Sequence, residues 1–303
     1  MIPRVLVHGG VDSRSNPETL DGLRTAASAG LRALGERDAV GAAETAVRAL
    51  EAAPLFNAGI GSVLNEDGDV ETDAAVADGT HGRFAGVAAL MDVRNPVSVA
   101  TALLRTSPGP VLLVGAGARR FAATLGALVG DLRTQEQVSS WREAKQGRDR
   151  ATSPFTGRFA GASDTVGAIA VDEHGRIAAA SSTGGVQMKM PGRVGDSAIF
   201  GAGIYADAER AILCSGLGEA AIELNLALRV AMWCEVVGDP DDAVTWGVAR
   251  LEERRATGGV VLYDRETDRV AVAHNASSFP VIEASESGSR VVASAYWSER
   301  ADD

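Results

Sequence analysis

The chain contains 303 residues, of which 46% are hydrophobic and 23% are charged, and its formal net charge is −11. This acidic balance, with only two lysines (Lys145 and Lys189), argues against nucleic acid or an anionic membrane surface as a partner, because both need clustered basic residues. No apolar run reaches the roughly 18 residues that span a bilayer, and the opening MIPRVLVHGG is unlike a signal peptide, so we expect a soluble, cytoplasmic protein.

The first part of the chain predicts a strand and two helices. RVLVH, at Arg4–His8, predicts a buried strand, and Asn16 with Pro17 supplies a helix cap and a first-turn proline. A second helix follows the Asp38 cap through AVGAAETAVRALEAA, whose apolar residues recur every three or four positions, and Pro54 ends it. The next segment, LFNAGIGSVLNEDG, predicts a glycine-rich loop.

Further strands and helices precede a change in composition. AGVAALMDV, from Ala85, predicts a strand, and NPVSVATALLRT predicts a helix with Asn95 as its cap. PVLLVGAGARRFAATLGAL predicts a strand that leads into another helix. Residues 134–163 are polar, mixed in charge and poor in aliphatic periodicity, and we interpret them as a linker.

The second half of the chain starts with a predicted β-hairpin. DTVGAIAV and RIAAASS are joined by the turn DEHG, so Thr165 lies where the linker meets a strand. GEAAIELNLALRVAMWCEVV predicts one long apolar helix, DDAVTWGVARLEERRA another, and GGVVLYDRETDRVAVAH a second hairpin. Two strand-rich halves, each with its own helices, favour two packed sheets between helical layers over an alternating parallel sheet.

Neither cysteine stands in a metal-ligand pattern. No His or Cys is spaced from Cys214 or Cys234 as a ligand set requires, which predicts two buried thiols rather than a disulfide or a zinc site. We therefore expect no cofactor.

Thr165 stands at a position where a threonine can become a nucleophile. Taken alone, a threonine at the start of a strand is most often structural. Cleavage before Thr165 would change its chemistry, because a free α-amine with a pKa near 8 would then lie beside the hydroxyl and could accept its proton. The preceding polar segment ends at Asp164, so a new chain end could be released there without unravelling a core element.

Several motifs in order make the chain resemble one enzyme family. SDTVGAIAVDEHGRIAAASSTGG, KMPGRVGDS, GAGIYAD and CSGLGE are similar to the β-subunit of plant-type asparaginases, isoaspartyl peptidases and glycosylasparaginases, and HGG with PLFNAGIGSVLNEDGDVETDAAVADG resembles their α-subunit. The resemblance implies an α+β fold, the four-layer αββα sandwich of N-terminal-nucleophile hydrolases. It also implies self-cleavage between Asp164 and Thr165 and a homodimer of α/β pairs. Residues 1–164 and 165–303 would be the two halves of one folded domain.

The resemblance implies a catalytic role for Thr165 and a substrate-binding role for PGRVGDS. Thr165 would attack the side-chain carbonyl of L-asparagine or a β-aspartyl peptide, and Thr183 in SSTGG would orient the nucleophile. Arg193 would grip the substrate α-carboxylate with two parallel hydrogen bonds, and Asp196 would bind the α-ammonium. Without the motif, an arginine and an aspartate three residues apart could equally form a surface ion pair. Thr183 could equally be a structural residue of a turn.

Other motif residues carry implied roles around the reacting carbonyl. The Ser215 hydroxyl and the Gly216 N–H match an oxyanion hole, and Gly218 matches a backbone contact to substrate. The family commonly has threonine at the Ser215 and Leu217 positions, so Leu217 departs from the pattern and leaves the substrate preference open. Asn57 matches an asparagine that reaches toward the nucleophile.

Two further features near the implied site are not catalytic. His8 of HGG is interpreted as a packing and hydrogen-bonding residue, because the threonine amine already serves as the base. The loop from Leu50 to Ile60 resembles one whose backbone carbonyls hold a structural sodium ion, with the implied oxygens on Leu50, Glu51, Ala53, Phe56, Ala58 and Ile60.

Three alternatives to this interpretation remain. PVLLVGAGARR could begin a dinucleotide-binding fingerprint at Gly115 and Gly117, but Arg120 occupies the third glycine position and no acidic residue ends a second strand about 20 residues later. A non-catalytic family member that never cleaves itself is the second alternative. A glycosylasparaginase-like hydrolase is the third, since those proteins often carry DT before the strand.

Overall fold

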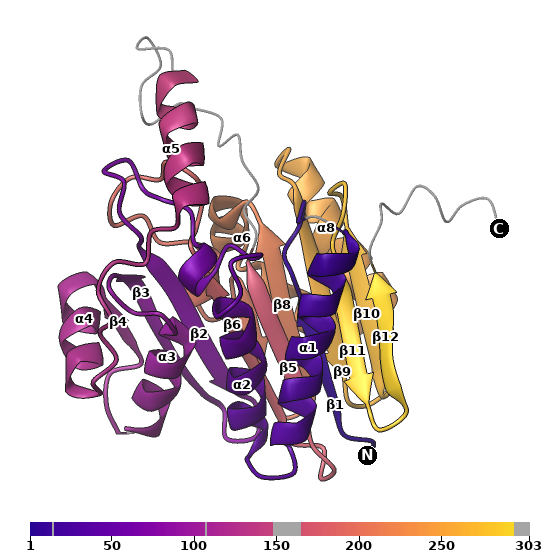
Figure 1. Ribbon diagram of the computed structural model, residues 1–303. Coiled ribbons are helices and arrows are strands. Elements are labelled where there is room, and N and C mark those ends of the chain that lie inside the picture. Colours follow the sequence, from indigo (N-terminus) through magenta and orange to yellow (C-terminus); the bar gives the residue numbers. More distant parts are fainter. Residues whose placement is uncertain (14, 107, 148–164, 294–303) are drawn as a thin grey trace.

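The computed structural model describes residues 1–13, 15–106, 108–147 and 165–293. It confirms an α+β chain, with helices and two separate β-sheets (Figure 1). Both sides of the Asp164–Thr165 bond contribute strands to the larger sheet, so the two predicted halves share one core.

The larger sheet has eight strands in the order β12-β11-β1-β5-β6-β2-β3-β4. All neighbours are antiparallel except β3 and β4, which are parallel. The strands are β1 (Arg4–His8), β2 (Thr72–Asp78), β3 (Arg83–Leu90), β4 (Leu112–Val114), β5 (Val166–Val171), β6 (Ile177–Thr183), β11 (Val281–Ser285) and β12 (Gly288–Ala293). Thr165 therefore precedes a strand in the middle of the sheet.

The smaller sheet has four antiparallel strands in the order β10-β9-β8-β7. They are β7 (Ile204–Ala206), β8 (Arg210–Gly216), β9 (Gly258–Asp264) and β10 (Arg269–His274). Both predicted hairpins are confirmed, since β5 pairs with β6 and β9 pairs with β10.

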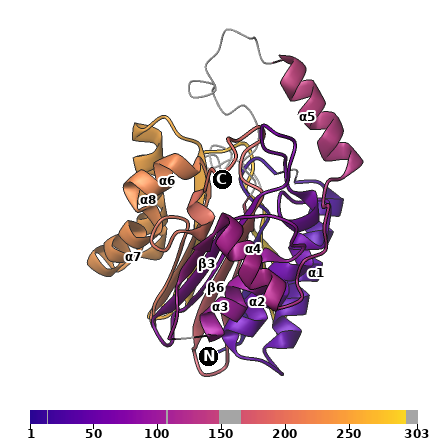
Figure 2. The same ribbon diagram turned by 90° about the vertical axis from the view of Figure 1, so that its left-hand side faces the viewer.

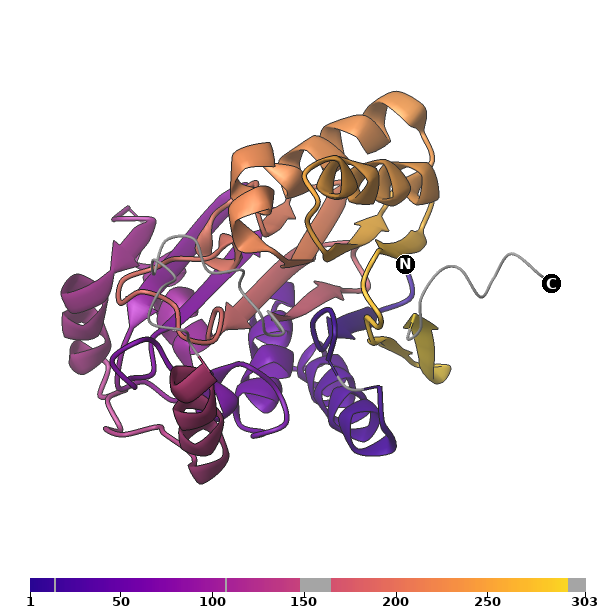
Figure 3. The same ribbon diagram turned by 90° about the horizontal axis from the view of Figure 1, so that it is seen from above.

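Helices cover the outer face of each sheet. Figure 2 shows α1 to α4 on one side of the strands and α6 to α8 on the other, and Figure 3 shows the same separation from above. The helices are α1 (Pro17–Ala33), α2 (Ala39–Glu51), α3 (Pro96–Arg105), α4 (Gly115–Thr124), α5 (Gln135–Gly147), α6 (Gly218–Leu224), α7 (Leu226–Val237) and α8 (Pro240–Glu253). Two short 3₁₀ turns, η1 (Gly59–Gly61) and η2 (Asp196–Ala198), lie in loops.

The alternation of side chains along each strand divides the core. Val5 and Val7 of β1 pack with α1 and α2, whereas Leu6 between them packs with strands of the smaller sheet. A third apolar cluster joins the outer face of the smaller sheet to α6, α7 and α8. Because β1 and β5 are buried on both faces, they appear in the sequence as nearly unbroken apolar runs.

Two of the predicted helix caps are confirmed and one works differently. The Asn16 and Asp38 side chains accept hydrogen bonds from Thr19 N (2.8 Å) and Gly41 N (2.7 Å). Asn95 makes no such bond at the start of α3. Instead, the Glu51 carboxyl accepts from Val97 N (3.0 Å) and from the Asn95 side chain (3.1 Å), so a fully buried acid caps the helix.

Two predicted segments differ from the structure. The long apolar helix is broken at Asn225, whose left-handed backbone (φ 49°) separates α6 from α7. Within the predicted linker, residues 135–147 form α5, where the Trp141 indole N–H donates to the Asn65 carbonyl (2.8 Å) and its ring lies against Gly68. That helix lacks an apolar stripe of several turns, which is why periodicity missed it. Residues 148–163 lie outside the described residues.

Other expectations concern cysteines, the glycine motif and membranes. Cys214 and Cys234 are both free and buried, as predicted.

The GAG motif follows β4, a short and exposed strand at the sheet edge, whereas a dinucleotide fingerprint follows a strand inside a parallel sheet. Among the helices in the described part of the chain, none has an apolar stretch long enough to cross a membrane.

The buried carboxyl under α3 predicts a pH dependence of stability. Burial raises the pKa of Glu51 to about 8. Between about pH 5 and about pH 8 the unfolded chain releases a proton that the folded protein keeps, so the free energy of unfolding should fall with rising pH, by at most about 1.4 kcal/mol per unit. Glu51→Gln cannot ionise and should give a flatter profile in denaturant titrations across this window. Parallel profiles would contradict the assignment.

Candidate functional site

The candidate site lies where the central strands of the larger sheet end. In the antiparallel register His8 pairs with Gly167 and Val166 with Ser182, while Asp73, at the start of β2, pairs with Thr183. The end of β1, the start of β5 and the end of β6 therefore meet at one edge of the sheet. Thr165, the residue before β5, is 1% exposed at this edge.

The Thr165 hydroxyl contacts a serine that sequence reasoning did not select. Thr165 Oγ1 lies 3.1 Å from Ser197 Oγ, and both side chains are buried. Ser197 belongs to the turn η2, directly after Asp196. Its position inside the quoted motif PGRVGDS was the only signal in the sequence that could have indicated it.

Thr183 and Asn57 lie together at the turn that follows β6. Thr183 Oγ1 accepts from Gly185 N (3.0 Å), and the Asn57 side-chain amide donates to the Gly185 carbonyl (2.7 Å). Gly184 N donates to the Asn57 backbone carbonyl (2.9 Å). A Cβ added at Gly184 would lie 2.4 Å from Asn57 Oδ1, so only glycine allows this approach. The structure thus joins the loop around Asn57 to the strand that carries Thr183.

Arg193 is held by an acid from the neighbouring motif. Its Nε and Nη2 donate to the two carboxylate oxygens of Glu219 at 2.9 Å and 2.8 Å, a bidentate pair. Burial raises the pKa of Glu219, but the hydrogen bonds from Arg193 lower it overall, so Glu219 is a carboxylate. The Arg193 side chain is only 13% exposed. Glu219, from CSGLGE, is a second residue that sequence reasoning missed.

Asp196 and Arg193 converge on Gly218. A Cβ added at Gly218 would lie 3.0 Å from Arg193 Nη2 and 3.0 Å from Asp196 Oδ1. Asp196 is 3% exposed, and its Oδ2 atom has no hydrogen-bond partner within the described residues. Burial raises the pKa of Asp196 to about 7, although the nearby Arg193 lowers it. A guanidinium and an unpaired carboxyl oxygen can bind the two charged groups of an α-amino acid.

Residues at the start of β2 hold the loop that carries this pair. Glu71 Oε2 accepts from Gly192 N and Asp73 Oδ2 accepts from Gly195 N, each at 2.9 Å. The fully buried Lys189 ammonium donates to the Glu71 carbonyl (2.7 Å). Burial lowers the pKa of Lys189, and the charges of Asp73 and Glu71 oppose that effect. The loop is therefore anchored on both sides of Arg193.

Ser215 and Gly216 end β8 beside the first loop of the chain. Ser215 Oγ accepts from Val11 N at 3.1 Å, which ties the end of the smaller sheet to the segment after β1. Gly216 has φ 134°, and a Cβ there would lie 2.3 Å from the Thr257 carbonyl oxygen. Only glycine fits this position.

His8 is neutral and packed at this edge. Burial lowers its pKa to about 3, although the Thr165 backbone raises it. Its ring lies 5.3 Å from the Phe279 ring, and a Cβ at Gly167 would approach His8 Nε2 to 2.4 Å. These contacts agree with a packing role beside Thr165.

The loop after α2 brings carbonyl oxygens around two glycines. A Cβ at Gly59 (φ 54°) would lie 2.4 Å from the Glu51 carbonyl oxygen, and one at Gly61 would lie 2.1 Å from the Phe56 carbonyl oxygen. The Phe56 carbonyl also accepts from Ala58 N (2.8 Å). No group of His, Cys, Asp and Glu side chains in the described part of the chain could hold a metal ion.

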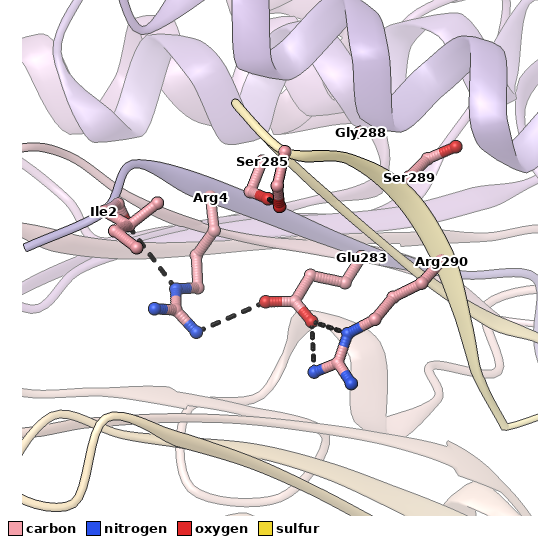
Figure 4. Close-up of a pocket in the computed structure, with 8 residues that line it drawn as sticks. Ile2, Arg4, Glu283, Ser285, Gly288, Ser289 and Arg290 are labelled. Carbon is pink, nitrogen blue, oxygen red and sulfur yellow. Dashed lines mark hydrogen bonds and ion pairs between the residues drawn. The ribbon is translucent and has the colours of Figure 1, made fainter.

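A polar pocket elsewhere contains none of these residues. Figure 4 shows Glu283 between the guanidinium groups of Arg4 and Arg290, at 3.2 Å and 2.6 Å. Arg4 is at the opposite end of β1 from His8, on the order of 13 Å away along the strand. The charged side chains of this pocket are paired with one another, and the pocket lies away from Thr165.

The two glycines near the site predict different effects on stability. Gly216→Ala should lower the free energy of unfolding by at least about 2 kcal/mol, because it adds a side chain at a left-handed φ against a backbone oxygen. Gly218→Ala is the matched control. Gly218 has no positive φ, and a Cβ there would meet its nearest atoms, on Arg193 and Asp196, at 3.0–3.1 Å instead of 2.3 Å. The loss for Gly218→Ala should therefore be clearly smaller in the same unfolding measurement. Equal losses would contradict this account.

Comparison with known proteins identifies the family of the chain. A family model described as asparaginase (Asparaginase_2) matches residues 1–292. The plant-type L-asparaginase of Pyrococcus abyssi is 40% identical over 240 residues, which cover 74% of this chain and 76% of that protein. The isoaspartyl peptidase/L-asparaginase of Rattus norvegicus is 37% identical over 281 residues (88% and 82%), and that of Homo sapiens is 35% identical over 280 residues (89% and 90%). The chain therefore belongs to the asparaginase family that these proteins represent.

Proposed function

We propose that this protein hydrolyses L-asparagine, β-aspartyl peptides or both, through Thr165, after cutting its own chain between Asp164 and Thr165. The family match and the names of the relatives support the reaction class. The observation that carries the assignment is the position of Thr165, buried at the start of the central strand β5, with Thr183 on the neighbouring strand. Asp164 itself lies outside the described residues.

The fold fits the same proposal. Two sheets share an apolar interface, and each outer face is covered by helices. We assign this arrangement to the four-layer αββα sandwich of N-terminal-nucleophile hydrolases. In such a fold, a nucleophile at the start of a central strand is held rigidly by its neighbours on both sides.

The first reaction makes the nucleophile. Thr165 Oγ1 attacks the Asp164 carbonyl carbon, the peptide C–N bond breaks, and the hydroxyl proton ends on the new amine. Water then hydrolyses the ester, which leaves a carboxylate at Asp164 and a free amine on Thr165. This amine has a pKa near 8 and serves as the base in each later turnover.

Turnover repeats the attack on a substrate amide. Thr165 forms an acyl-enzyme with the substrate side-chain carbonyl, ammonia or an amino acid leaves, and water releases aspartate. The Ser215 hydroxyl and the Gly216 N–H would stabilise the oxyanion, and Thr183 and Asn57 would orient the groups around Thr165. Ser215 is already placed at the end of β8 by its bond from Val11 N.

The charges around Gly218 suit the α-amino acid part of the substrate. Arg193 donates hydrogen bonds to Glu219 from Nε and from Nη2. The remaining N–H groups, on Nη1 and Nη2, would bind the substrate α-carboxylate. The buried Asp196 carboxyl would bind the α-ammonium through Oδ1, the oxygen that lies beside Gly218. Gly218 leaves the space between them open.

Other features of the proposal rest on the resemblance. The carbonyl oxygens of the loop after α2 suit a structural sodium ion, which would stabilise the loop that carries Asn57. Assembly as a homodimer of α/β pairs and a cytoplasmic location stay predictions. The glycosylasparaginase-like and non-catalytic alternatives are separated from the proposal by a substrate panel and by the processing experiment below.

Thr165→Ala tests the nucleophile. The wild-type protein should convert from one chain of 31.2 kDa into two fragments that divide before Thr165. The variant should stay intact and inactive, because it lacks the attacking hydroxyl. Intact-mass analysis of the wild type and the variant over several days, with N-terminal sequencing of any fragments, follows the cleavage. Fragments from the variant would reject Thr165 as the self-cleaving residue, and a wild type that stays whole would favour the non-catalytic alternative.

The raised pKa of Asp196 predicts a pH dependence of substrate binding. Its carboxyl is ionised above about pH 7 and neutral below, whereas a substrate α-amine stays protonated up to about pH 8. KM should therefore increase as the pH falls below 7, in addition to the fall in kcat that protonation of the Thr165 amine causes over the same range. Steady-state kinetics of the processed enzyme between pH 5.5 and 8 test this. Asp196→Asn should show a high KM that no longer depends on pH in this range, and a wild-type KM that is constant with pH would reject the role.

A further inference from the structure

We infer that Ser197 is a positioning residue that holds the Thr165 hydroxyl for the self-cleavage reaction. The inference rests on the proposed function, and it adds a residue to which neither the motif roles nor the relatives' names assign a task. Its basis is the contact of 3.1 Å between Ser197 Oγ and Thr165 Oγ1, with Thr165 1% exposed and Ser197 fully buried.

Ser197 is itself held rigidly. Its carbonyl accepts from the Ser181 hydroxyl of β6 at 2.6 Å. The turn η2 is closed by Ile199 N, which donates to the Asp196 carbonyl (2.9 Å). Glycines let the neighbouring chain approach closely, since a Cβ at Gly203 would lie 2.6 Å from the Asp196 carbonyl oxygen and one at Gly86 would lie 2.9 Å from the Ala198 carbonyl oxygen. The Ser197 hydroxyl therefore has a fixed place relative to β5.

The chemistry of the two reactions makes this contact more important before cleavage than after it. In the intact chain the Thr165 nitrogen is part of an amide and cannot accept the hydroxyl proton. The direction of Oγ1 then depends on the hydroxyl groups around it, among which Ser197 is in contact. After cleavage the free α-amine lies next to Oγ1 and can orient it as well as accept its proton.

Ser197 does not change its own state in this reaction. The bond formed joins Thr165 Oγ1 to the Asp164 carbonyl carbon, the bond broken is the peptide C–N bond, and the threonine proton ends on the nitrogen. The hydrogen bond between the two hydroxyl groups, in which either oxygen can be the donor, limits the side-chain rotamers open to Thr165. Water then hydrolyses the resulting ester and separates the two fragments.

The same turn also serves substrate binding in the proposed site. Asp196 faces the position of the substrate α-ammonium, and Ser197 contacts the nucleophile from the next position in the chain. A shift of η2 would therefore move both groups together. This arrangement explains why the turn is buried and closed by glycines although it lies in a loop.

Ser197→Ala tests the inference, with Ser181→Ala as the matched control. Both variants remove one buried serine hydroxyl, but Ser181 contacts the backbone of Ser197 and Ser197 contacts the nucleophile. Ser197→Ala should cleave roughly tenfold more slowly than the wild type, because about one hydrogen bond to the reacting group is lost. Ser181→Ala loosens the turn but leaves the Ser197 hydroxyl beside the nucleophile, so it should slow cleavage less than Ser197→Ala does, by no more than about threefold. Fragment formation is followed by intact mass on freshly purified full-length protein.

Turnover gives the second readout. Once Ser197→Ala has cleaved fully, its kcat should lie within about threefold of the wild-type value, because the α-amine then orients the hydroxyl. Ser197→Thr, which keeps the hydroxyl, should restore most of the cleavage rate. If the wild type cleaves and Ser197→Ala cleaves at the same rate, this inference alone is wrong. The same holds if Ser181→Ala slows cleavage as much as Ser197→Ala does. A wild type that never cleaves would overturn the proposed function with it.

Discussion

The position of Thr165 depends on the burial of one central strand on both of its faces. β5 is hydrogen-bonded to β1 and β6, with helices packed on one face and the smaller sheet on the other. A strand fixed in this way has little freedom to slide or twist, because a register shift of one residue would exchange its two buried faces. Thr165 inherits that rigidity, and its hydroxyl keeps a fixed contact with Ser197.

The balance of buried charges organises the part of the site around Arg193. The site contains two largely buried cations, Lys189 and Arg193. The acids around them are Glu71, Asp73, Asp196 and Glu219. Buried charges are costly unless they are compensated. Arg193 forms an ion pair with Glu219, whereas Lys189 donates to the Glu71 backbone carbonyl and has the charges of Asp73 and Glu71 nearby. Asp196 is the acid with an oxygen left without a partner in the described structure. The substrate ammonium of the proposed reaction would complete the balance.

The departure at Leu217 also has a place in the fold. Its side chain packs against the apolar cluster of the smaller sheet and α6 to α8, directly before the first turn of α6. A threonine at this position could offer a hydroxyl near the substrate, whereas leucine adds apolar packing under Gly218. In the proposed site Leu217 directly precedes Gly218, so its replacement of threonine would bear on substrate preference rather than on the nucleophile.

The sequence by itself determined the elements whose signals are local. The apolar runs of β1 and β5, the caps at Asn16 and Asp38, both hairpins and the reaction class through the ordered motifs could all be obtained from neighbouring residues. Local pattern failed at Asn225, where apolar residues on both sides concealed a left-handed break, and at α5, which is held by contacts such as Trp141 with Asn65 instead of an apolar stripe. Only the tertiary structure brought Ser197 to Thr165 and Glu219 to Arg193, because each pair joins residues more than 20 positions apart. A hydrogen bond across such a distance depends on how sheets and turns pack, and no periodicity or spacing in one chain encodes it directly.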